Sequence, residues 1–210
     1  MSRGIERSVV PPVVIAGMAK AAKSWNALHG TWASRAPEYW FTVTVAQELQ
    51  RKLDDQKKWI RLEGSVLQTM SSSGPAVVGR PVSSLRRKGR CDIVIERANE
   101  SPFAAIEIKT RAYAFTAGIR SDVVRLRELL CRGGKNSLSV VCLASYSDAS
   151  EKDSLNGAKA RLERRFENFV ERATELCVGK QLRVESRELI RRGDESGDLW
   201  GVQCLTLLRR

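Results

Sequence analysis

The sequence predicts an α/β fold, with a mixed β-sheet flanked by helices. Three observations indicate this class: some stretches repeat apolar residues at helical spacing, others are short runs of branched aliphatic residues, and the two kinds are interspersed along the chain. The expected order is α-β-β-β-α-β, followed by a helix and two strands. A chain of 210 residues without internal repeats suits one domain, whose core needs no disulfide or metal.

The chain is expected to consist of an N-terminal extension and a single domain. The extension covers residues 1–33 and lies outside the core, although its residues 16–28 could form a short helix. The domain covers residues 34–210, with its core at about 35–145 and a C-terminal helix and strand pair at 150–210.

The first core helix is predicted at residues 34–57. Ser34 can cap this helix, Pro37 is tolerated in a first turn, and Glu38 complements the helix dipole. Glu48 borders the buried face, because the apolar side chains next to it follow the helical repeat. Those apolar side chains are Phe41, Val45, Ala46, Leu49 and Leu53.

The next elements are strands. Residues 59–67 alternate loosely between apolar and polar, which predicts a strand, and residues 71–75 are rich in serine, glycine and proline and predict a loop. Two aliphatic runs, 91–96 and 103–109, surround the turn-forming residues 98–102 and predict a β-hairpin.

The rest of the chain predicts two more helices and three strands. Ser121 and Asp122 are expected to cap a helix that stops at Gly133 and Gly134. The remaining elements are a buried strand at 138–144, a long helix at 154–177, and strands at 181–190 and 199–208. The polar face of the long helix mixes arginines with glutamates, a pattern more typical of a solvated face than of a binding surface.

The charge balance indicates a polyanionic partner. The chain has 36 Lys and Arg against 24 Asp and Glu, a net charge of +12, which favours nucleic acid first and an anionic membrane surface second. Residues 80–135 hold 13 of the basic and 6 of the acidic residues, so more than half of the surplus lies there. The basic side chains expected to contact phosphates are Arg86, Arg87, Lys88, Arg111 and Arg120.

Membrane and zinc sites find no support in the sequence. The apolar stretch at residues 9–16 is too short, and too interrupted by prolines, to span a membrane or to act as a secretory signal. The five cysteines are scattered without a Cys-x-x-Cys pair, so they predict neither a disulfide framework nor a zinc site. We expect a cytoplasmic protein with reduced cysteines.

Charged residues interrupt the predicted hairpin at three places. Asp92 opens its first strand, and Glu107 and Lys109 lie in its second. A charge within an apolar strand costs free energy unless it is paired or binds a metal. Because side chains alternate along a strand, Glu107 and Lys109 share one face, and Asp92 lies at the same end of the hairpin.

Such a cluster suits phosphodiester hydrolysis. Two carboxylates can hold Mg²⁺ with several waters in place, the ion polarises a phosphoryl oxygen and lowers the pKa of water, and a lysine orients the water or stabilises developing charge. The alternative without chemistry is a buried ion pair in which Lys109 neutralises Glu107 and Asp92 only begins a strand.

Asp92 followed by Glu107-Ile108-Lys109 resembles the motif of the PD-(D/E)XK, or restriction-endonuclease-like, nuclease superfamily. The resemblance covers residues of about 35–145 and implies a mixed sheet with an α-β-β-β-α-β core. It also implies that Asp92, Glu107 and the Ile108 carbonyl bind Mg²⁺ or Mn²⁺ and that Lys109 acts on the attacking water. Glu48 resembles the glutamate that many members carry on the first core helix.

The chain departs from the family motif at Cys91, which stands where the motif has proline. The resemblance implies a nuclease, more specifically an endonuclease, acting on DNA, with RNA as an open alternative substrate. A homodimer would suit double-strand cleavage. The competing hypothesis is a non-catalytic nucleic-acid-binding module, or a subunit of a larger complex, on the same fold.

Overall fold

A six-stranded mixed sheet forms the centre of the protein in the computed structural model, which describes residues 7–53, 58–73, 89–132, 138–150, 155–193 and 198–210. The strands lie in the order β1-β2-β3-β4-β6-β5. Neighbouring strands are antiparallel except β3 and β4, which are parallel because α4 crosses between them. The strands are β1 (Trp59–Ser65), β2 (Arg90–Glu96), β3 (Pro102–Lys109), β4 (Val140–Ala149), β5 (Leu182–Arg192) and β6 (Leu199–Arg209).

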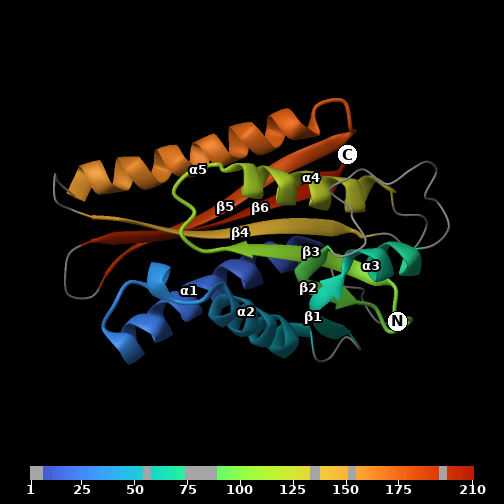
Figure 1. Cartoon of the computed structure of the whole chain (residues 1–210), viewed down its shortest axis with the longest axis horizontal. Helices are drawn as coiled ribbons and strands as arrows, with labels where there is room; N and C mark the ends of the chain where they lie inside the picture. Colours follow the sequence, from blue (N-terminus) through green and yellow to red (C-terminus); the bar gives the residue numbers. More distant parts are fainter. Residues whose placement is uncertain (1–6, 54–57, 74–88, 133–137, 151–154, 194–197) are drawn as a thin grey trace.

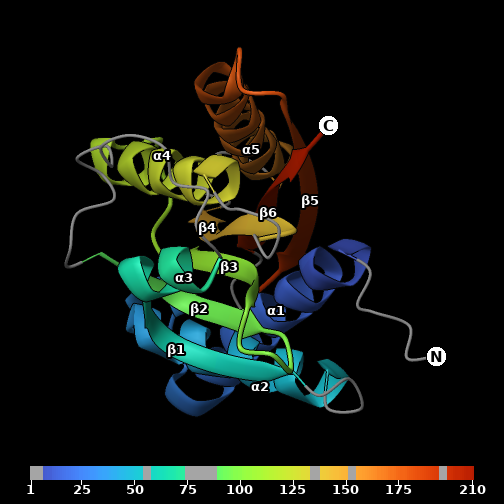
Figure 2. The same ribbon diagram turned by 90° about the vertical axis from the view of Figure 1, so that its right-hand side faces the viewer.

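Helices cover both faces of the sheet (Figures 1 and 2). Helices α1 and α2 pack on one face, and α3, α4 and α5 pack on the other. Their bounds are α1 (Val10–His29), α2 (Glu38–Leu53), α3 (Val66–Ser72), α4 (Ala117–Arg132) and α5 (Leu155–Cys177), with short 3₁₀ turns at Arg7–Val9 and Ala33–Arg35. The predicted mixed sheet flanked by helices is therefore confirmed.

Side-chain alternation in β3 separates two apolar cores. Ile106 and Ile108 point toward α1 and α2, whereas Ala105 belongs to the core beneath α4 and α5. Since Glu107 and Lys109 follow Ala105 at steps of two, their side chains emerge on the α4 face. The sheet thereby determines which helix supplies their partners.

Placing the N-terminal helix outside the core was wrong. Val10, Val14 and Met18 on α1 are fully buried against α2 and the sheet. They recur at a spacing of four residues, which places them on one side of the helix. The two prolines that interrupt this apolar run lie in the first turn, where a backbone N–H has no intrahelical partner to lose.

Two other predicted elements differ from those in the structure. Residues 71–75 were expected to be a loop, but α3 follows β1 directly and includes Ser71 and Ser72, while residues 74 and 75 lie outside the described residues. The Ser65 hydroxyl accepts a hydrogen bond from Gln68 N–H (3.4 Å) at the start of α3. Ser34 does not cap α2: it lies in the second 3₁₀ turn, and α2 begins at Glu38.

The start of α4 was also misplaced. The helix begins at Ala117, and the Thr116 hydroxyl accepts a hydrogen bond from Ile119 N–H (3.3 Å), as a capping residue does. Ser121 and Asp122, predicted as the cap, lie one turn inside the helix. The helix ends at Arg132, next to the predicted Gly133–Gly134 stop, which lies outside the described residues.

The remaining predictions agree with the structure apart from their bounds. The hairpin, the long helix and the last two strands form where expected, while β4 extends to Ala149. Cys142 and Cys204 are buried and unpaired in any disulfide. Across the described residues, no helix combines the length and the apolar character needed to cross a membrane.

The contact between α1 and α2 depends on Gly17. A Cβ atom at this position would lie 2.8 Å from the Val45 Cα and 3.0 Å from its Cγ2. We expect Gly17→Ala to destabilise the protein by about 1–3 kcal/mol, because a backbone atom blocks the added methyl group. In an ordinary helix the same change stabilises. Thermal unfolding measures the effect.

Gly118→Ala is the matched control. On α4 an added Cβ would meet only the Thr116 Oγ1, at 3.7 Å, which is ordinary contact. Its melting temperature should stay the same or rise, with a gain of at most about 1 kcal/mol. Equal melting temperatures for the two variants would contradict the close packing of α1 on α2.

Candidate active site

The three charged residues of the hairpin come together at its open end. The register pairs Ile93 with Ile106, and one further step places Asp92 opposite Glu107, on the same face of the sheet. The Asp92 Oδ2 accepts a hydrogen bond from the Ile108 N–H (2.6 Å). The carboxylate of Asp92 is therefore held against the second strand by its backbone.

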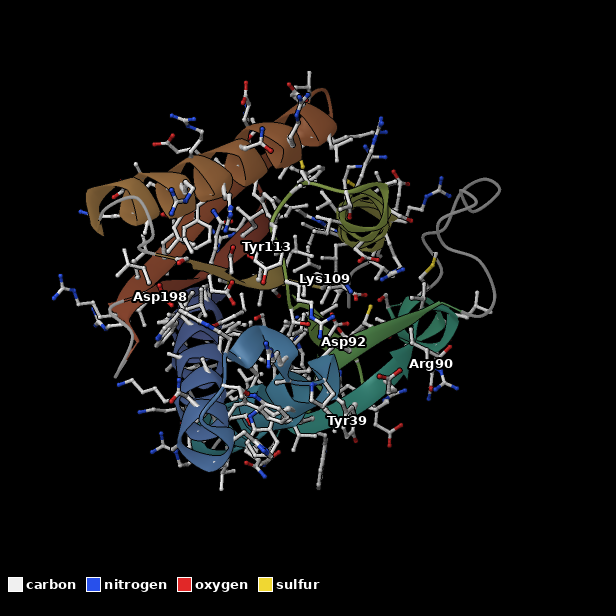
Figure 3. All side chains as sticks on the ribbon, turned by 60° about the vertical axis from the view of Figure 1, so that its left-hand side comes forward. Tyr39, Arg90, Asp92, Lys109, Tyr113 and Asp198 are labelled. Carbon is white, nitrogen blue, oxygen red and sulfur yellow. The ribbon has the colours of Figure 1, made fainter. Side chains whose placement is uncertain are left out.

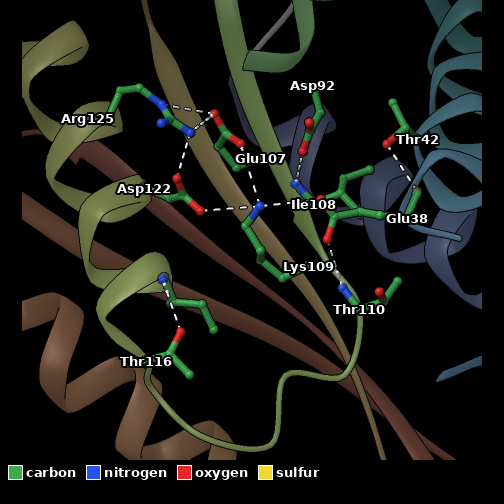
Figure 4. Close-up of polar contacts among 11 residues, drawn as sticks. Glu38, Thr42, Asp92, Glu107, Ile108, Lys109, Thr110, Thr116, Asp122 and Arg125 are labelled. Atoms are coloured by element: carbon green, nitrogen blue, oxygen red, sulfur yellow. Dashed lines mark hydrogen bonds and ion pairs between the residues drawn. The ribbon is translucent and has the colours of Figure 1, made fainter. Parts of the chain in front are cut away.

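Glu107 is the buried centre of this cluster, with 2% of the residue exposed. Its Oε1 accepts hydrogen bonds from Arg125 on α4, at 2.6 Å from Nη2 and 3.2 Å from Nε. The same Nη2 lies 2.6 Å from the Asp122 Oδ1 (Figure 4). The α4 helix thus supplies both a cation and a second carboxylate.

Lys109 lies among three carboxylates. Its Nζ is 3.2 Å from the Asp122 Oδ2, 3.4 Å from the Glu38 Oε1 and 4.0 Å from the Glu107 Oε2. Glu38, at the start of α2, also accepts a hydrogen bond from the Thr110 N–H (3.4 Å) through Oε2. Residues from both helical layers therefore meet at the end of β3 (Figure 4).

Negative charge exceeds positive charge in this cluster. It contains the carboxylates of Glu38, Asp92, Glu107 and Asp122 but only the cations of Lys109 and Arg125. Burial raises the pKa of Glu107 to about 8, although the charge of Arg125 opposes the rise. The charges of Asp92 and Asp122 contribute to this rise in the Glu107 pKa, and burial also raises the pKa of Glu38.

At Lys109, burial and the neighbouring charges shift the pKa in opposite directions. Burial alone would lower the pKa of Lys109, but the carboxylates around it, Asp122 and Glu38 first, raise that pKa above its usual value. Lys109 therefore carries a proton at neutral pH. It can donate hydrogen bonds and stabilise negative charge, but it is not poised to accept a proton.

Glu48 does not reach this cluster. Its carboxylate accepts hydrogen bonds from Lys20 Nζ (2.7 Å) and Arg51 Nη2 (2.6 Å), which lower its pKa. It follows Glu38 by ten residues, or about 15 Å along the helix. The first core helix does bring a glutamate to the cluster, but that residue is Glu38 and not the predicted Glu48.

Sequence reasoning also missed Asp122 and Arg125. Asp122 was interpreted as a helix cap, and Arg125 was only one of many basic residues on a basic chain. A helical wheel would have placed the two side chains together, since they are three residues apart. Only the packing of α4 on β3 reveals that Glu107 is their partner.

The predicted phosphate-binding residues have different positions. Arg86, Arg87 and Lys88 lie outside the described residues. Arg111 donates a hydrogen bond from Nε to the Ser34 carbonyl (2.5 Å), which ties the end of β3 to the second 3₁₀ turn. Arg120 is exposed in the first turn of α4.

The donor set fits a divalent ion that retains water. Asp92 and Glu107 present carboxylates on one face, and the excess of negative charge favours a bound cation. Within the described part of the chain, no three His, Cys, Asp or Glu side chains form a group that could hold a metal ion. Mg²⁺ fits such a site because it needs only one or two carboxylates; the Ile108 carbonyl stays a predicted ligand.

Comparisons with known proteins return no relative. No protein-family model matches the chain, and neither a curated protein nor a solved structure matches it.

The raised pKa of Glu107 makes stability depend on pH. Folding shifts this pKa from 4.5 to about 8, so the folded state binds the extra proton and stability is lost as pH rises through that range. In EDTA, we expect Glu107→Gln to reduce this loss, by on the order of a few kcal/mol between the two ends of the range. Urea unfolding of both proteins at several pH values between 4.5 and about 8 measures how the free energy of unfolding changes with pH.

Glu128→Gln is the matched control on α4. This carboxylate is also buried, and burial alone would raise its pKa, but hydrogen bonds from Arg132 and Arg127 lower it. Its contribution to stability is therefore lost only as pH falls below 4.5. If both variants show the same pH slope as the wild type, Glu107 is not the titrating group.

Proposed function

We propose that this protein is a metal-dependent nuclease that hydrolyses DNA phosphodiester bonds with Mg²⁺ or Mn²⁺, as an endonuclease. The observation that carries the proposal is the convergence of Asp92, Glu107 and Lys109 on one face at the open end of the hairpin. The excess of carboxylates there supports a bound cation. The net charge of +12 supports a polyanionic substrate.

The arrangement of the elements also supports a restriction-endonuclease-like core. Helix α2, strands β1, β2 and β3, helix α4 and strand β4 follow one another, and the four strands are neighbours in that order. This is the α-β-β-β-α-β order that the resemblance implies. Helix α3 is inserted after β1, and α1, α5, β5 and β6 are added around the core.

In this proposal, Asp92 and Glu107 hold the ion, with the Ile108 carbonyl as a further ligand. The bound ion would polarise the phosphoryl oxygen and lower the pKa of a water. The Ile108 N–H orients Asp92, and Arg125 orients Glu107 from α4. Both carboxylates are thus positioned before substrate arrives.

Lys109 acts as a protonated group. Its ammonium, held between Asp122 and Glu38, donates a hydrogen bond to the attacking water or to the phosphoryl oxygen on which charge develops. Glu38 also accepts from Thr110 and so fixes the backbone that carries the lysine. Glu38 and Asp122 are therefore positioning residues for Lys109.

One observation favours a non-catalytic nucleic-acid-binding module instead. Arg125 already neutralises Glu107, so the buried carboxylate is satisfied without a metal. Calorimetric titration with Mg²⁺ separates the two functions, because the nuclease should bind the ion through Asp92 and Glu107 and the module should give no binding heat.

A cleavage assay tests the proposal directly. Purified protein is incubated with plasmid, linear duplex and single-stranded DNA, and with RNA, in Mg²⁺, in Mn²⁺ and in EDTA. The proposal expects DNA products only with a divalent ion. Intact DNA in every reaction, with DNA binding retained, would contradict the proposed nuclease activity and favour the non-catalytic binding module.

Removing the lysine should separate cleavage from binding. We expect Lys109→Ala to lower the rate of DNA cleavage by about 10²–10⁴-fold, because the transition state loses its positioned cation, while DNA affinity changes little. The control is Lys20→Ala, whose ammonium pairs with Glu48 away from the cluster. Undiminished cleavage by Lys109→Ala would remove this residue from the mechanism.

A second pair of variants tests which glutamate of α2 supports the site. Glu38→Gln should slow cleavage at least about tenfold, since it weakens the hold on Lys109. Glu48→Gln, on the same helix, should cleave DNA at the wild-type rate. A pH–rate profile adds a second readout. Glu38 raises the pKa of Lys109, so in Glu38→Gln the fall in cleavage rate that accompanies deprotonation of Lys109 should move to lower pH. The opposite ranking of the two rates would restore the original assignment to Glu48.

A further inference from the structure

Three arginines of α5 line up along the helix. At about 100° per residue, Arg161, Arg165 and Arg172 fall within about 40° of one another. Arg164 lies on the adjoining side, about 60° from Arg161, among the glutamates at positions 171 and 175. This helix of mixed charge thus includes a basic stripe of three arginines, with both signs of charge beside it.

The basic stripe borders a groove beside the β3–α4 loop. The groove has a volume of about 320 Å³ and contains Tyr113, Phe115, Arg161, Arg164 and Arg165 in its lining, with no carboxylate. Phe115 packs edge-on against Phe169 of α5 (5.4 Å between ring centroids), which joins the loop to the helix. Arg164 is exposed, and none of the described residues pairs with its side chain.

A second groove continues the first past Phe115. It has a volume of about 370 Å³ and is lined by Arg120 of α4 and by Arg172, Glu175 and Leu176 of α5. Together the two grooves are lined by five arginines and one glutamate, of which Arg172 pairs with Glu175 (3.2 Å) and Arg161 donates a hydrogen bond to the Ser150 carbonyl. A guanidinium group can donate hydrogen bonds to two phosphate oxygens at once, and an exposed aromatic ring can stack on a base.

Hydrogen bonds hold part of the wall of the first groove against β4. Arg165 donates hydrogen bonds to the Ser147 hydroxyl (2.8 Å) and the Asp148 carbonyl (2.6 Å), and its guanidinium lies over the Tyr113 ring, 5.2 Å from the centroid. The Tyr113 hydroxyl donates to the Asp148 Oδ1 (3.0 Å). The loop is therefore pinned to β4, and the arginines of the two grooves line a path beside it.

This path leads to the candidate active site. Tyr113 follows Lys109 by four residues, so their Cα atoms lie within about 14 Å. Figure 3 shows both side chains on the same side of the molecule, with α5 above them. Phosphates recur along a duplex strand at about 3.4 Å per base pair, so the groove lies within a few nucleotides of the cluster.

We propose that the two grooves between the β3–α4 loop, α4 and α5 bind the sugar-phosphate backbone of the nucleic acid whose neighbouring phosphate enters the candidate active site. Arg120 and Arg164 contact phosphates, and the exposed part of the Tyr113 ring offers a surface to a base. The choice of ligand rests on the proposed function. The binding itself requires no cleavage.

Fluorescence anisotropy with a short labelled DNA, single-stranded and duplex, tests this surface in EDTA. The double variant Arg120→Gln/Arg164→Gln should bind at least about tenfold more weakly at about 0.1 M salt, and the slope of log affinity against log salt should fall by about two. The control is Arg187→Gln/Arg191→Gln, two exposed arginines of β5 that line neither groove. Thermal unfolding verifies that all variants fold.

Each outcome decides the proposal. Weaker DNA binding confined to the groove variant supports it, even if the wild type cleaves nothing, in which case only the nuclease fails. Wild-type affinity in the groove variant, or an equal loss in the control, overturns it and leaves the cleavage proposal standing. Binding to anionic phospholipid vesicles or to an acidic peptide, but not to DNA, also overturns it.

Discussion

The ion pair between Glu107 and Arg125 is the interaction on which the centre of this protein depends. A carboxylate in a strand covered on both faces costs several kcal/mol unless a cation and hydrogen bonds compensate it. Arg125 provides both from α4, and Asp122 holds the guanidinium in place. This pairing requires α4 to pack over β3, so the helical layer and the charged cluster are established together.

The cations of the cluster compensate its carboxylates only in part. The cluster keeps more carboxylates than cations, the pKa of Glu107 is raised to about 8, and Lys109 is held protonated by its neighbours. An apolar residue at position 107 would avoid the cost of burying a charge. The raised pKa means that Glu107 takes up a proton near neutral pH, and in the proposed nuclease a bound cation would take the place of that proton.

The two helical layers have different roles around that point. Helices α1 and α2 pack closely on one face and bring Glu38 to the end of β3. On the other face, α4 and α5 contribute the charges next to Glu107 and the arginines along the grooves. The β3–α4 loop connects the cluster to the grooves, because it begins at Thr110 and carries both Tyr113 and Phe115.

Local patterns in the sequence determined the fold class, the central hairpin, the long helix and the convergence of Asp92, Glu107 and Lys109, since alternation within a strand and pairing across a turn depend on near neighbours. The burial of α1 and the choice of Glu38 over Glu48 depended on the tertiary structure. So did the partnership of Arg125 with Glu107. Those contacts join residues far apart in the chain, and helix periodicity gives the face of a side chain but not the element that the face meets.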